Sequence, residues 1–278
     1  MALPLFSIVT ITYQNLEGLR RTVESVRSLS FCDLEHIVID GGSTDGTAEW
    51  LAANFDGSWV SEPDGGRYHA MNKGARMARG EYLWFMHAGD AFGDPLVLQR
   101  VATAIEGAKT RPEWLYGLAR VVNSDGSLHS TLGIVPFRMF NFAVLLRPMP
   151  HQATAIRREL FWKIGGYDEE FGIAADQLLM LRAADATPPM PLADFLCDFD
   201  GTGISANRSA WSLYRDGKRM LRHLSTPVMR WRALDNLIAL SYALIRQLAQ
   251  SFRASALRPN ENAGSGQLPS PDLTGQPS

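Results

Sequence analysis

The first hundred residues alternate between short, continuous apolar runs and stretches in which apolar residues recur every three or four positions. The continuous runs are predicted strands, at residues 6–12, 35–40, 59–60 and 82–86. The periodic stretches between and after them are predicted helices, at residues 16–26, from a cap at Ser43 or Thr44 to about 54, at 70–78 and at 97–105. Strands that are apolar on both faces and alternate with helices predict an α/β fold built on a mostly parallel, Rossmann-like central sheet.

The regular alternation weakens after Trp114. A hairpin is predicted over residues 121–128, around the turn Asn123-Ser124-Asp125-Gly126, and helices are predicted over 159–164 and 176–184. Residues 133–150 carry no clear pattern. We therefore predict a main domain over residues 1–210, a helical arm over 211–258 that is broken near Pro227, and a disordered, Pro-, Gly- and Ser-rich tail over 259–278.

The composition is that of an ordinary soluble domain. The 278 residues are 46% hydrophobic and 20% charged, and the two cysteines, Cys32 and Cys197, are isolated, so neither a disulfide framework nor a cysteine zinc site is expected. The N-terminus has no basic segment followed by an apolar one, so no signal peptide is expected. The longest uncharged apolar stretch of the arm, 236–245, is too short to span a bilayer. We expect a cytoplasmic protein.

The charge is unevenly distributed along the chain. Residues 1–210 contain 18 basic and 25 acidic residues, a net charge of −7, whereas residues 211–258 contain nine basic and two acidic residues, a net charge of +7. Basic amphipathic helices that carry tryptophan suit an anionic membrane surface, here the inner face of the cell membrane. Packing of the arm on the main domain, with its arginines in solvent, is the alternative. Nucleic acid is not expected as a partner, because the predicted site is acidic.

Polar side chains follow each of the first four predicted strands. Thr12 and Tyr13 follow the first, and Asp40, Asp64 and Asp90 follow the next three. The carboxyl ends of parallel strands form the ligand crevice of such sheets, and carboxylates that converge there favour a hard divalent cation. Gly41-Gly42-Ser43-Thr44-Asp45-Gly46 matches neither the dinucleotide fingerprint nor, with Thr47-Ala48 after it, the P-loop. A glycine loop is therefore not expected to hold phosphates.

Three ordered segments resemble family 2 glycosyltransferases. They are Ser7-Ile8-Val9-Thr10-Ile11-Thr12-Tyr13, Ile39-Asp40-Gly41-Gly42-Ser43-Thr44-Asp45-Gly46-Thr47 and Ser61-Glu62-Pro63-Asp64-Gly65-Gly66-Arg67-Tyr68-His69-Ala70-Met71-Asn72-Lys73-Gly74. The resemblance covers about residues 5–205. It implies a GT-A fold and transfer of a sugar from a nucleotide-diphosphate donor, in assembly of a cell-surface polysaccharide or glycolipid.

The resemblance also implies roles for particular residues. Thr12 and Tyr13 would line the nucleoside pocket, Asp40 would accept a hydrogen bond from the base, and Asp64 would approach the nucleoside end of the donor. On the following helix, Asn72 and Lys73 would help to hold the donor, with Lys73 acting as a point charge. The acceptor would be a saccharide or a lipid-linked saccharide.

Asp90 lies at the end of the region in which the family binds a divalent metal, Mg²⁺ or Mn²⁺. This region reads His87-Ala88-Gly89-Asp90, with one carboxylate where members often have two or three, so His87 is a further candidate ligand. Met149-Pro150-His151-Gln152 resembles a subgroup motif, and His151 is a candidate for a metal or diphosphate contact. His69 stands where similar sequences often carry Asp.

Gly165-Gly166-Tyr167-Asp168-Glu169-Glu170-Phe171, followed by Ala174-Ala175-Asp176, resembles the acceptor loop and the catalytic-base helix of the family. Asp176 would be the general base, with Asp168 on the acceptor side, although an Asp at a helix start is also a common N-cap. One base acting on an acceptor hydroxyl implies single displacement with inversion. The alternative function is that of a non-catalytic nucleotide-sugar-binding relative docked at the membrane surface.

Overall fold

The computed structural model describes residues 3–123, 126–143, 148–200, 209–225, 227–229 and 231–256. The first half contains β1 (Phe6–Thr12), α1 (Leu16–Arg27), β2 (Leu34–Asp40), α2 (Thr47–Asn54), β3 (Ser58–Ser61), α3 (Arg67–Met77), β4 (Tyr82–His87), β5 (Ala91–Phe92) and α4 (Val97–Gly107). The second half contains β6 (Trp114–Val122), β7 (Leu128–Leu132), α5 (Met139–Ala143), a 3-10 turn (His151–Ala153), β8 (Thr154–Arg157), α6 (Arg158–Lys163), α7 (Ala175–Ala186), β9 (Met190–Asp200), α8 (Ala210–Leu221) and α9 (Arg232–Ala256).

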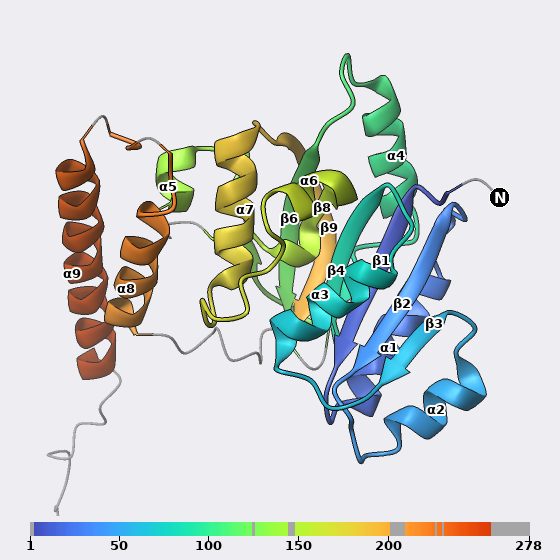
Figure 1. Cartoon of the computed structure of the whole chain (residues 1–278). Coiled ribbons are helices and arrows are strands. Elements are labelled where there is room, and N and C mark those ends of the chain that lie inside the picture. The colour runs from blue at the N-terminus through green and yellow to red at the C-terminus, as the bar shows by residue number, and fades with distance from the viewer. Residues whose placement is uncertain are drawn as a thin grey trace, which may run out of the picture.

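One sheet runs through the molecule in the order β3-β2-β1-β4-β8-β6-β9-β5, with β7 paired to β6 (Figure 1). Strands β3, β2, β1 and β4 are mutually parallel, and β6 and β9 are also parallel. The antiparallel pairs all involve strands that come after β4 in the chain. The predicted α/β class with a mostly parallel, Rossmann-like sheet is confirmed, and the parallel half carries the predicted polar strand ends.

The predicted elements of the first half are confirmed, with one error. Asn15 caps α1 as predicted, since its side chain accepts a hydrogen bond from the Gly18 amide. Helix α2, however, begins at Thr47 after the N-cap Gly46, whose φ of 88° is left-handed, and the Thr47 amide donates to Asp45 Oδ1 at 3.2 Å. The Ser43 hydroxyl lies too far from the helix to cap it; it donates to Asp40 Oδ1 at 2.5 Å and accepts the Gln14 amide at 2.7 Å.

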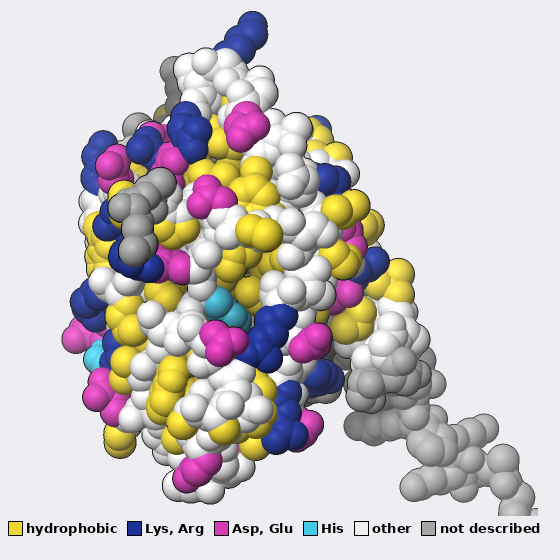
Figure 2. All heavy atoms as spheres, turned by 90° about the vertical axis from the view of Figure 1, so that its right-hand side faces the viewer, with side chains coloured by type: hydrophobic (Ala, Val, Ile, Leu, Met, Phe, Trp, Pro, Cys, Tyr) yellow, Lys and Arg dark blue, Asp and Glu magenta, His cyan; other side chains and the backbone are white. Residues whose placement is uncertain are grey.

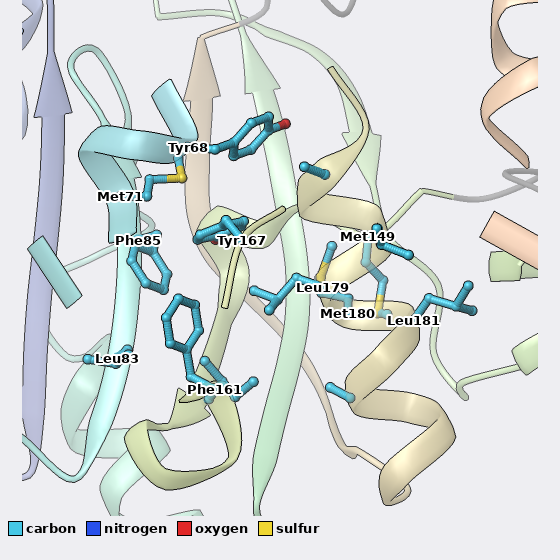
Figure 3. Packing of buried hydrophobic residues seen from close by; sticks show 14 of the residues in the cluster. Tyr68, Met71, Leu83, Phe85, Met149, Phe161, Tyr167, Leu179, Met180 and Leu181 are labelled. Carbon is cyan, nitrogen blue, oxygen red and sulfur yellow. The ribbon is translucent and has the colours of Figure 1, made fainter. Parts of the chain in front are cut away.

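Both faces of the sheet are covered, as the apolar strands require. On one face, residues of α3, α6 and α7 pack around Phe85 and Tyr167, with ring centroids 5.0 Å apart (Figure 3). Gly74 of α3 is needed for this layer because a Cβ there would overlap the Val9 side chain of β1. On the other face, α1 and α4 cover β1 and β4 through a second apolar cluster that includes Trp84 and Val101. These layers hold α3 and α7 beside the strand ends.

Two C-terminal helices extend the molecule beyond α7. Helix α8 lies between α5 and α9, and α9 is the outermost helix (Figure 1). The break predicted near Pro227 is confirmed, since α8 ends at Leu221 and α9 begins at Arg232. Met220, Leu221 and Ala239 belong to the same apolar cluster as α7, so these helices pack on the main body. The predicted tail, 259–278, lies outside the described residues, and the division into domains stays a prediction. Within the described part of the chain, no helix is long and apolar enough to cross a membrane.

Candidate active site

The carboxyl ends of β1, β2 and β3 meet in a small polar cluster. Asp40 is fully buried at the end of β2, and its carboxylate accepts hydrogen bonds from the Ser43 amide at 3.0 Å and the Ser61 hydroxyl at 2.6 Å. Thr12, at the end of β1, is 6% exposed, and its Oγ1 is buried with no hydrogen-bond partner among the described residues. An unpaired buried hydroxyl is costly. A polar ligand group beside Thr12 would remove that cost.

Gly41 allows Tyr13 and Asp64 to approach the same point. A Cβ at Gly41 would lie 3.0 Å from Asp64 Oδ2 and 3.3 Å from Tyr13 Cδ2. Tyr13 itself is 67% exposed, and Asp64 Oδ1 accepts the Gly66 amide at 2.7 Å. The structure therefore brings together the four residues predicted to contact the nucleoside: Thr12, Tyr13, Asp40 and Asp64. An exposed ring above a recessed carboxylate suits stacking and hydrogen bonding of a planar base.

Asn72 and Lys73, the two donor-binding candidates on α3, both contact other side chains or backbone groups of the protein. The Asn72 amide donates to the Tyr167 carbonyl at 2.9 Å and to Glu169 Oε1 at 2.8 Å, and its Oδ1 accepts the Tyr167 amide at 3.0 Å. Asn72 therefore holds the loop that precedes α7. Lys73 Nζ lies 2.8 Å from Glu62 Oε1 in an ion pair whose lysine side chain is 16% exposed. Their predicted donor contacts stay predictions.

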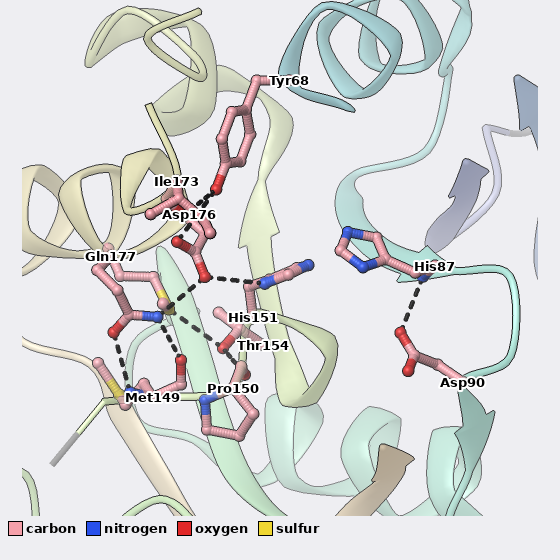
Figure 4. A network of polar contacts seen from close by, with 11 residues as sticks. Tyr68, His87, Asp90, Met149, Pro150, His151, Thr154, Ile173, Asp176 and Gln177 are labelled. Atoms are coloured by element: carbon pink, nitrogen blue, oxygen red, sulfur yellow. Dashed lines mark hydrogen bonds and ion pairs between the residues drawn. The ribbon is translucent and has the colours of Figure 1, made fainter. Parts of the chain in front are cut away.

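Asp176 lies in the first turn of α7 but does not cap it. The N-cap residue of α7 is Ala174, which has no capping side chain. The Asp176 carboxylate instead turns towards Tyr68 and His151 (Figure 4). Its Oδ2 accepts Gln177 Nε2 at 3.0 Å and lies 3.2 Å from His151 Nδ1. Its Oδ1 lies 3.3 Å from the Tyr68 hydroxyl. The network holds one carboxylate oxygen more tightly than the other.

Burial and hydrogen bonding act on Asp176 in opposite directions. Desolvation raises the pKa of Asp176, but the hydrogen bond and charge of His151, with the hydrogen bonds of Gln177, outweigh it and hold that pKa below its usual range. Burial raises the pKa of Tyr68 strongly, and the nearby Asp176 charge adds to that rise. At neutral pH the carboxylate is therefore ionised and Tyr68 keeps its proton. An ionised carboxylate can accept a proton from a hydroxyl.

The residues predicted to bind metal do not converge. Asp90 is 2% exposed, and its Oδ2 accepts the His87 amide at 2.9 Å. The His87 ring points away from Asp90 towards His151, and the two histidine ring centroids are 4.9 Å apart (Figure 4). In the described parts of the chain, no group of three or more His, Cys, Asp and Glu side chains could hold a metal ion. Asp90, His87 and His151 thus do not fit a cation site of the protein's own making.

Among the described residues, the rings of His87 and His151 are incompletely hydrogen-bonded. Burial lowers the pKa of His87 well below its usual value, and the nearby His151 lowers it further. Nε2 of His87 and Nε2 of His151 are both buried without a hydrogen-bond partner among the described residues. These two nitrogens therefore remain available to a polar group that enters beside them.

Asp168, predicted on the acceptor side, is used to fix the loop before α7. Its Oδ2 lies 3.1 Å from Arg182 Nη2, and the carboxylate side chain is 29% exposed. A guanidinium partner in this geometry satisfies the carboxylate. Asp168 therefore differs from Asp176, whose Oδ1 faces Tyr68.

A cavity of about 260 Å³ lies beside Tyr68, between the start of α3 and the loop before α7. Its lining residues are Gly65, Gly66, Arg67, Tyr68, His69, Glu169, Gly172 and Ile173. Tyr68 links this cavity to Asp176. Neither Tyr68 nor Gln177 was predicted from the sequence as a site residue. Gln177 had a usable signal, since Asp176-Gln177 is a polar pair at the start of an otherwise apolar stretch.

Comparisons with known proteins give relatives of one kind. The chain is 42% identical, over 221 residues that cover 78% of it and 83% of the relative, to an uncharacterized glycosyltransferase of Mycobacterium tuberculosis. It is 34% identical, over 63% of its length and 68% of the relative, to a PGL/p-HBAD biosynthesis glycosyltransferase of Mycobacterium bovis.

Solved structures share the fold. Residues 1–349 of S. aureus TarS, in complex with UDP-GlcNAc, superpose with a TM-score of 0.63 at 19% identity, covering 92% of this chain and 76% of that one. The mannosyltransferase PcManGT from Pyrobaculum calidifontis, in complex with GDP-Man and Mn²⁺, gives a TM-score of 0.60 at 20% identity, covering 92% and 79%. The family model for glycosyl transferase family 2 matches residues 7–165, more than half of the sequence. The chain therefore belongs to glycosyl transferase family 2.

Proposed function

We propose that this glycosyltransferase transfers a sugar from a nucleotide-diphosphate donor to a saccharide or lipid-linked acceptor, with inversion at the anomeric carbon. The observation that carries the proposal is the placement of Asp176: an ionised, nearly buried carboxylate with Oδ2 fixed and Oδ1 beside Tyr68. The relatives support the acceptor class, because one is a PGL/p-HBAD biosynthesis glycosyltransferase.

The proposed reaction is a single displacement with Asp176 as the general base. Asp176 takes the proton of the acceptor hydroxyl while its oxygen forms a bond to the anomeric carbon. The bond from that carbon to the diphosphate oxygen breaks, and its electron pair leaves with the nucleoside diphosphate. A single displacement inverts the configuration. Asp168 is paired with Arg182, so we do not assign it a role as a nucleophile.

The donor half of the site is proposed at the ends of β1, β2 and β3. A base stacked on Tyr13 would place its polar edge near Asp40 and Asp64, and Thr12 Oγ1 would gain a partner. We propose that sugar groups occupy the cavity beside Tyr68, because its Arg67, His69 and Glu169 side chains can hydrogen-bond hydroxyls. Both TarS and PcManGT were solved with nucleotide-sugar donors.

Dependence on Mg²⁺ or Mn²⁺ stays a prediction from the resemblance and from the Mn²⁺ in the PcManGT complex. A divalent cation often needs only one or two carboxylates when substrate phosphates complete its shell. The test is nucleoside diphosphate release after dialysis against EDTA. Recovery on addition of Mn²⁺ would support the prediction, and undiminished turnover without metal would contradict it.

A donor screen with a matched variant tests the proposal. The full chain is incubated with UDP- and GDP-sugars and a glycolipid extract, and release of the nucleoside diphosphate and transfer of label are measured. Asp176→Asn should lose at least about a hundredfold in turnover while keeping donor affinity, because the base is lost without a change of shape. Donor binding without turnover by the wild-type chain would favour the non-catalytic alternative. Full turnover by Asp176→Asn would refute the base assignment.

We further propose that α8 and α9 hold the protein at an anionic membrane surface, on the cytoplasmic face of the cell membrane. Trp231 and the α9 residues Leu237, Ile245 and Leu248 are each more than half exposed. Apolar side chains beside basic ones are typical of interfacial helices. By contrast, the face in Figure 2 mixes acidic and basic side chains without one dominant sign.

Vesicle sedimentation tests this surface. Binding to vesicles of mixed phosphatidylcholine and phosphatidylglycerol should exceed binding to phosphatidylcholine alone, and Ile245→Glu should weaken it at least about fivefold. Leu128→Glu is the matched control, because Leu128 is 61% exposed on β7 of the main body. Equal loss in both variants, or binding that ignores lipid charge, would refute the proposal.

A further inference from the structure

We propose that His151 is a positioning residue for Asp176, acting through its Nδ1 rather than as a ligand of a metal or diphosphate. The inference rests on the proposed function, in which Asp176 is the general base. His151 and Asp176 are 25 residues apart in sequence, and the 3-10 turn and α7 bring them together. The resemblance alone suggests a cation or diphosphate contact for His151, so the geometry leads to a different role.

The two carboxylate oxygens of Asp176 have different partners. Oδ2 is held by two donors, His151 Nδ1 at 3.2 Å and Gln177 Nε2 at 3.0 Å. Oδ1 faces the Tyr68 hydroxyl at 3.3 Å, and the single proton of that hydroxyl has a closer acceptor, the Ile173 carbonyl at 2.7 Å. Oδ1 is therefore the oxygen left for an acceptor hydroxyl. His151 and Gln177 fix the direction in which it points.

The His151 imidazole is held in a fixed orientation. The His151 side chain is 8% exposed, and its ring packs on His87 with centroids 4.9 Å apart. Because the Asp176 carboxylate is an acceptor, Nδ1 of the ring that faces it carries a proton. Nε2 is buried and has no hydrogen-bond partner among the described residues. A ring held in this way donates to Asp176 from one defined position.

Asp90 and His151 are poorly placed to bind one cation together. Asp90, the predicted carboxylate ligand, lies on the opposite side of His87 from His151 (Figure 4). To share a cation with Asp90, His151 would have to reach past the His87 ring with Nε2, since its Nδ1 faces Asp176. The hydrogen bond to a charged carboxylate favours the present arrangement.

Conservative variants distinguish the two ring nitrogens. In His151→Asn the amide nitrogen occupies roughly the place of Nδ1, whereas in His151→Gln it occupies roughly the place of Nε2. Nucleoside diphosphate release should fall about 10- to 100-fold in His151→Ala, which is what loss of one hydrogen bond to a charged group predicts. His151→Asn should recover most of that loss and His151→Gln little of it. The half-saturating Mn²⁺ concentration and the donor KM should stay within about twofold of wild type.

Two results would overturn the inference. One is recovery in His151→Gln but not in His151→Asn. The other is a His151→Ala variant whose activity returns at high Mn²⁺, as expected of a metal ligand. Asp176→Asn separates the two proposals, because full turnover in that variant refutes the base assignment itself.

A spectroscopic measurement tests the contact independently of turnover. Imidazole ¹⁵N spectra of the full chain should show a proton on Nδ1 of His151, and Asp176→Ala should abolish the preference for that nitrogen. A ring protonated only on Nε2 in the wild-type protein would also overturn the inference.

Discussion

Replacement of Asn72 by alanine tests how the loop before α7 is held. Asn72 is 4% exposed and makes three hydrogen bonds, two to the backbone of Tyr167 and one to Glu169. Asn72→Ala leaves the Tyr167 amide and carbonyl buried without partners, at about 1–3 kcal/mol each. Some relaxation of the loop is expected, so the free energy of unfolding should fall by about 2–4 kcal/mol.

The assay is urea unfolding followed by tryptophan fluorescence, with UDP and GDP binding measured by calorimetry under native conditions. Asn54→Ala is the matched control, because Asn54 is exposed at the end of α2 and its change should stay within about 0.5 kcal/mol. Donor affinity should be nearly unchanged in Asn72→Ala. A stability within 0.5 kcal/mol of wild type, or a tenfold loss of nucleotide affinity without destabilisation, would refute the reasoning and favour the donor contact predicted from sequence.

Three further predictions follow from local geometry. Gly41→Ala should weaken nucleotide binding about tenfold, because the added Cβ would press on the Asp64 carboxylate and the Tyr13 ring. Gly107→Ala, whose Cβ would have nothing within 4 Å, should leave binding unchanged, and calorimetry compares the two variants. Lys73→Ala should cost less than about 1 kcal/mol in urea unfolding, since its partner Glu62 is exposed, yet lower donor affinity if the lysine meets the diphosphate. Burial, with a smaller effect of Arg27, lowers the pKa of His36 from 6.5 to about 3, so the stability that neutral His36 contributes is complete above pH 6.5 and is lost as pH falls towards 3. At pH 5 the free energy of unfolding should therefore be lower by about 2 kcal/mol than at neutral pH, and His36→Gln should reduce that difference. The same dependence of unfolding free energy on pH in His36→Gln and wild type would contradict the assignment.

The parallel half of the fold could be predicted because its signals are local. Strands β1, β2 and β4 are nearly solid apolar runs, and the helix after β1 buries Leu19, Val23 and Val26 at regular spacing. The family resemblance added the order of the site residues. The strand pattern itself predicted that Thr12, Asp40 and Asp64 lie at one edge of the sheet, where the structure has them.

The second half could not be predicted in the same way because its strands depend on distant partners. Strand β9 contains Pro191 and three aspartates, which argues against a buried strand on local grounds. In the structure, Asp194 pairs with Arg100 and Asp198 with Arg120, each at 2.6 Å, so distant arginines compensate two of these charges. No local pattern reveals such pairs.

The site shows the same division between local and long-range information. The sequence predicted Asp176 at a helix start, but its contacts with His151 and Tyr68 join segments 25 and 108 residues away. Asn72 was predicted from the family resemblance to help hold the donor, and that contact stays a prediction. In the structure its amide donates to the Tyr167 carbonyl, 95 residues away in the sequence. Residue identities therefore suggested the chemistry, whereas side-chain directions required the fold.

Asp176 is proposed to act as the general base of a single displacement at the anomeric carbon. The most direct measurement is the one-bond NMR coupling between C1 and H1 of the transferred sugar, recorded on product made by the full chain from a donor of known anomeric configuration. We expect the anomeric configuration of the product to be opposite to that of the donor. A product with retained configuration would contradict it, because retention requires a mechanism other than the single displacement proposed for Asp176.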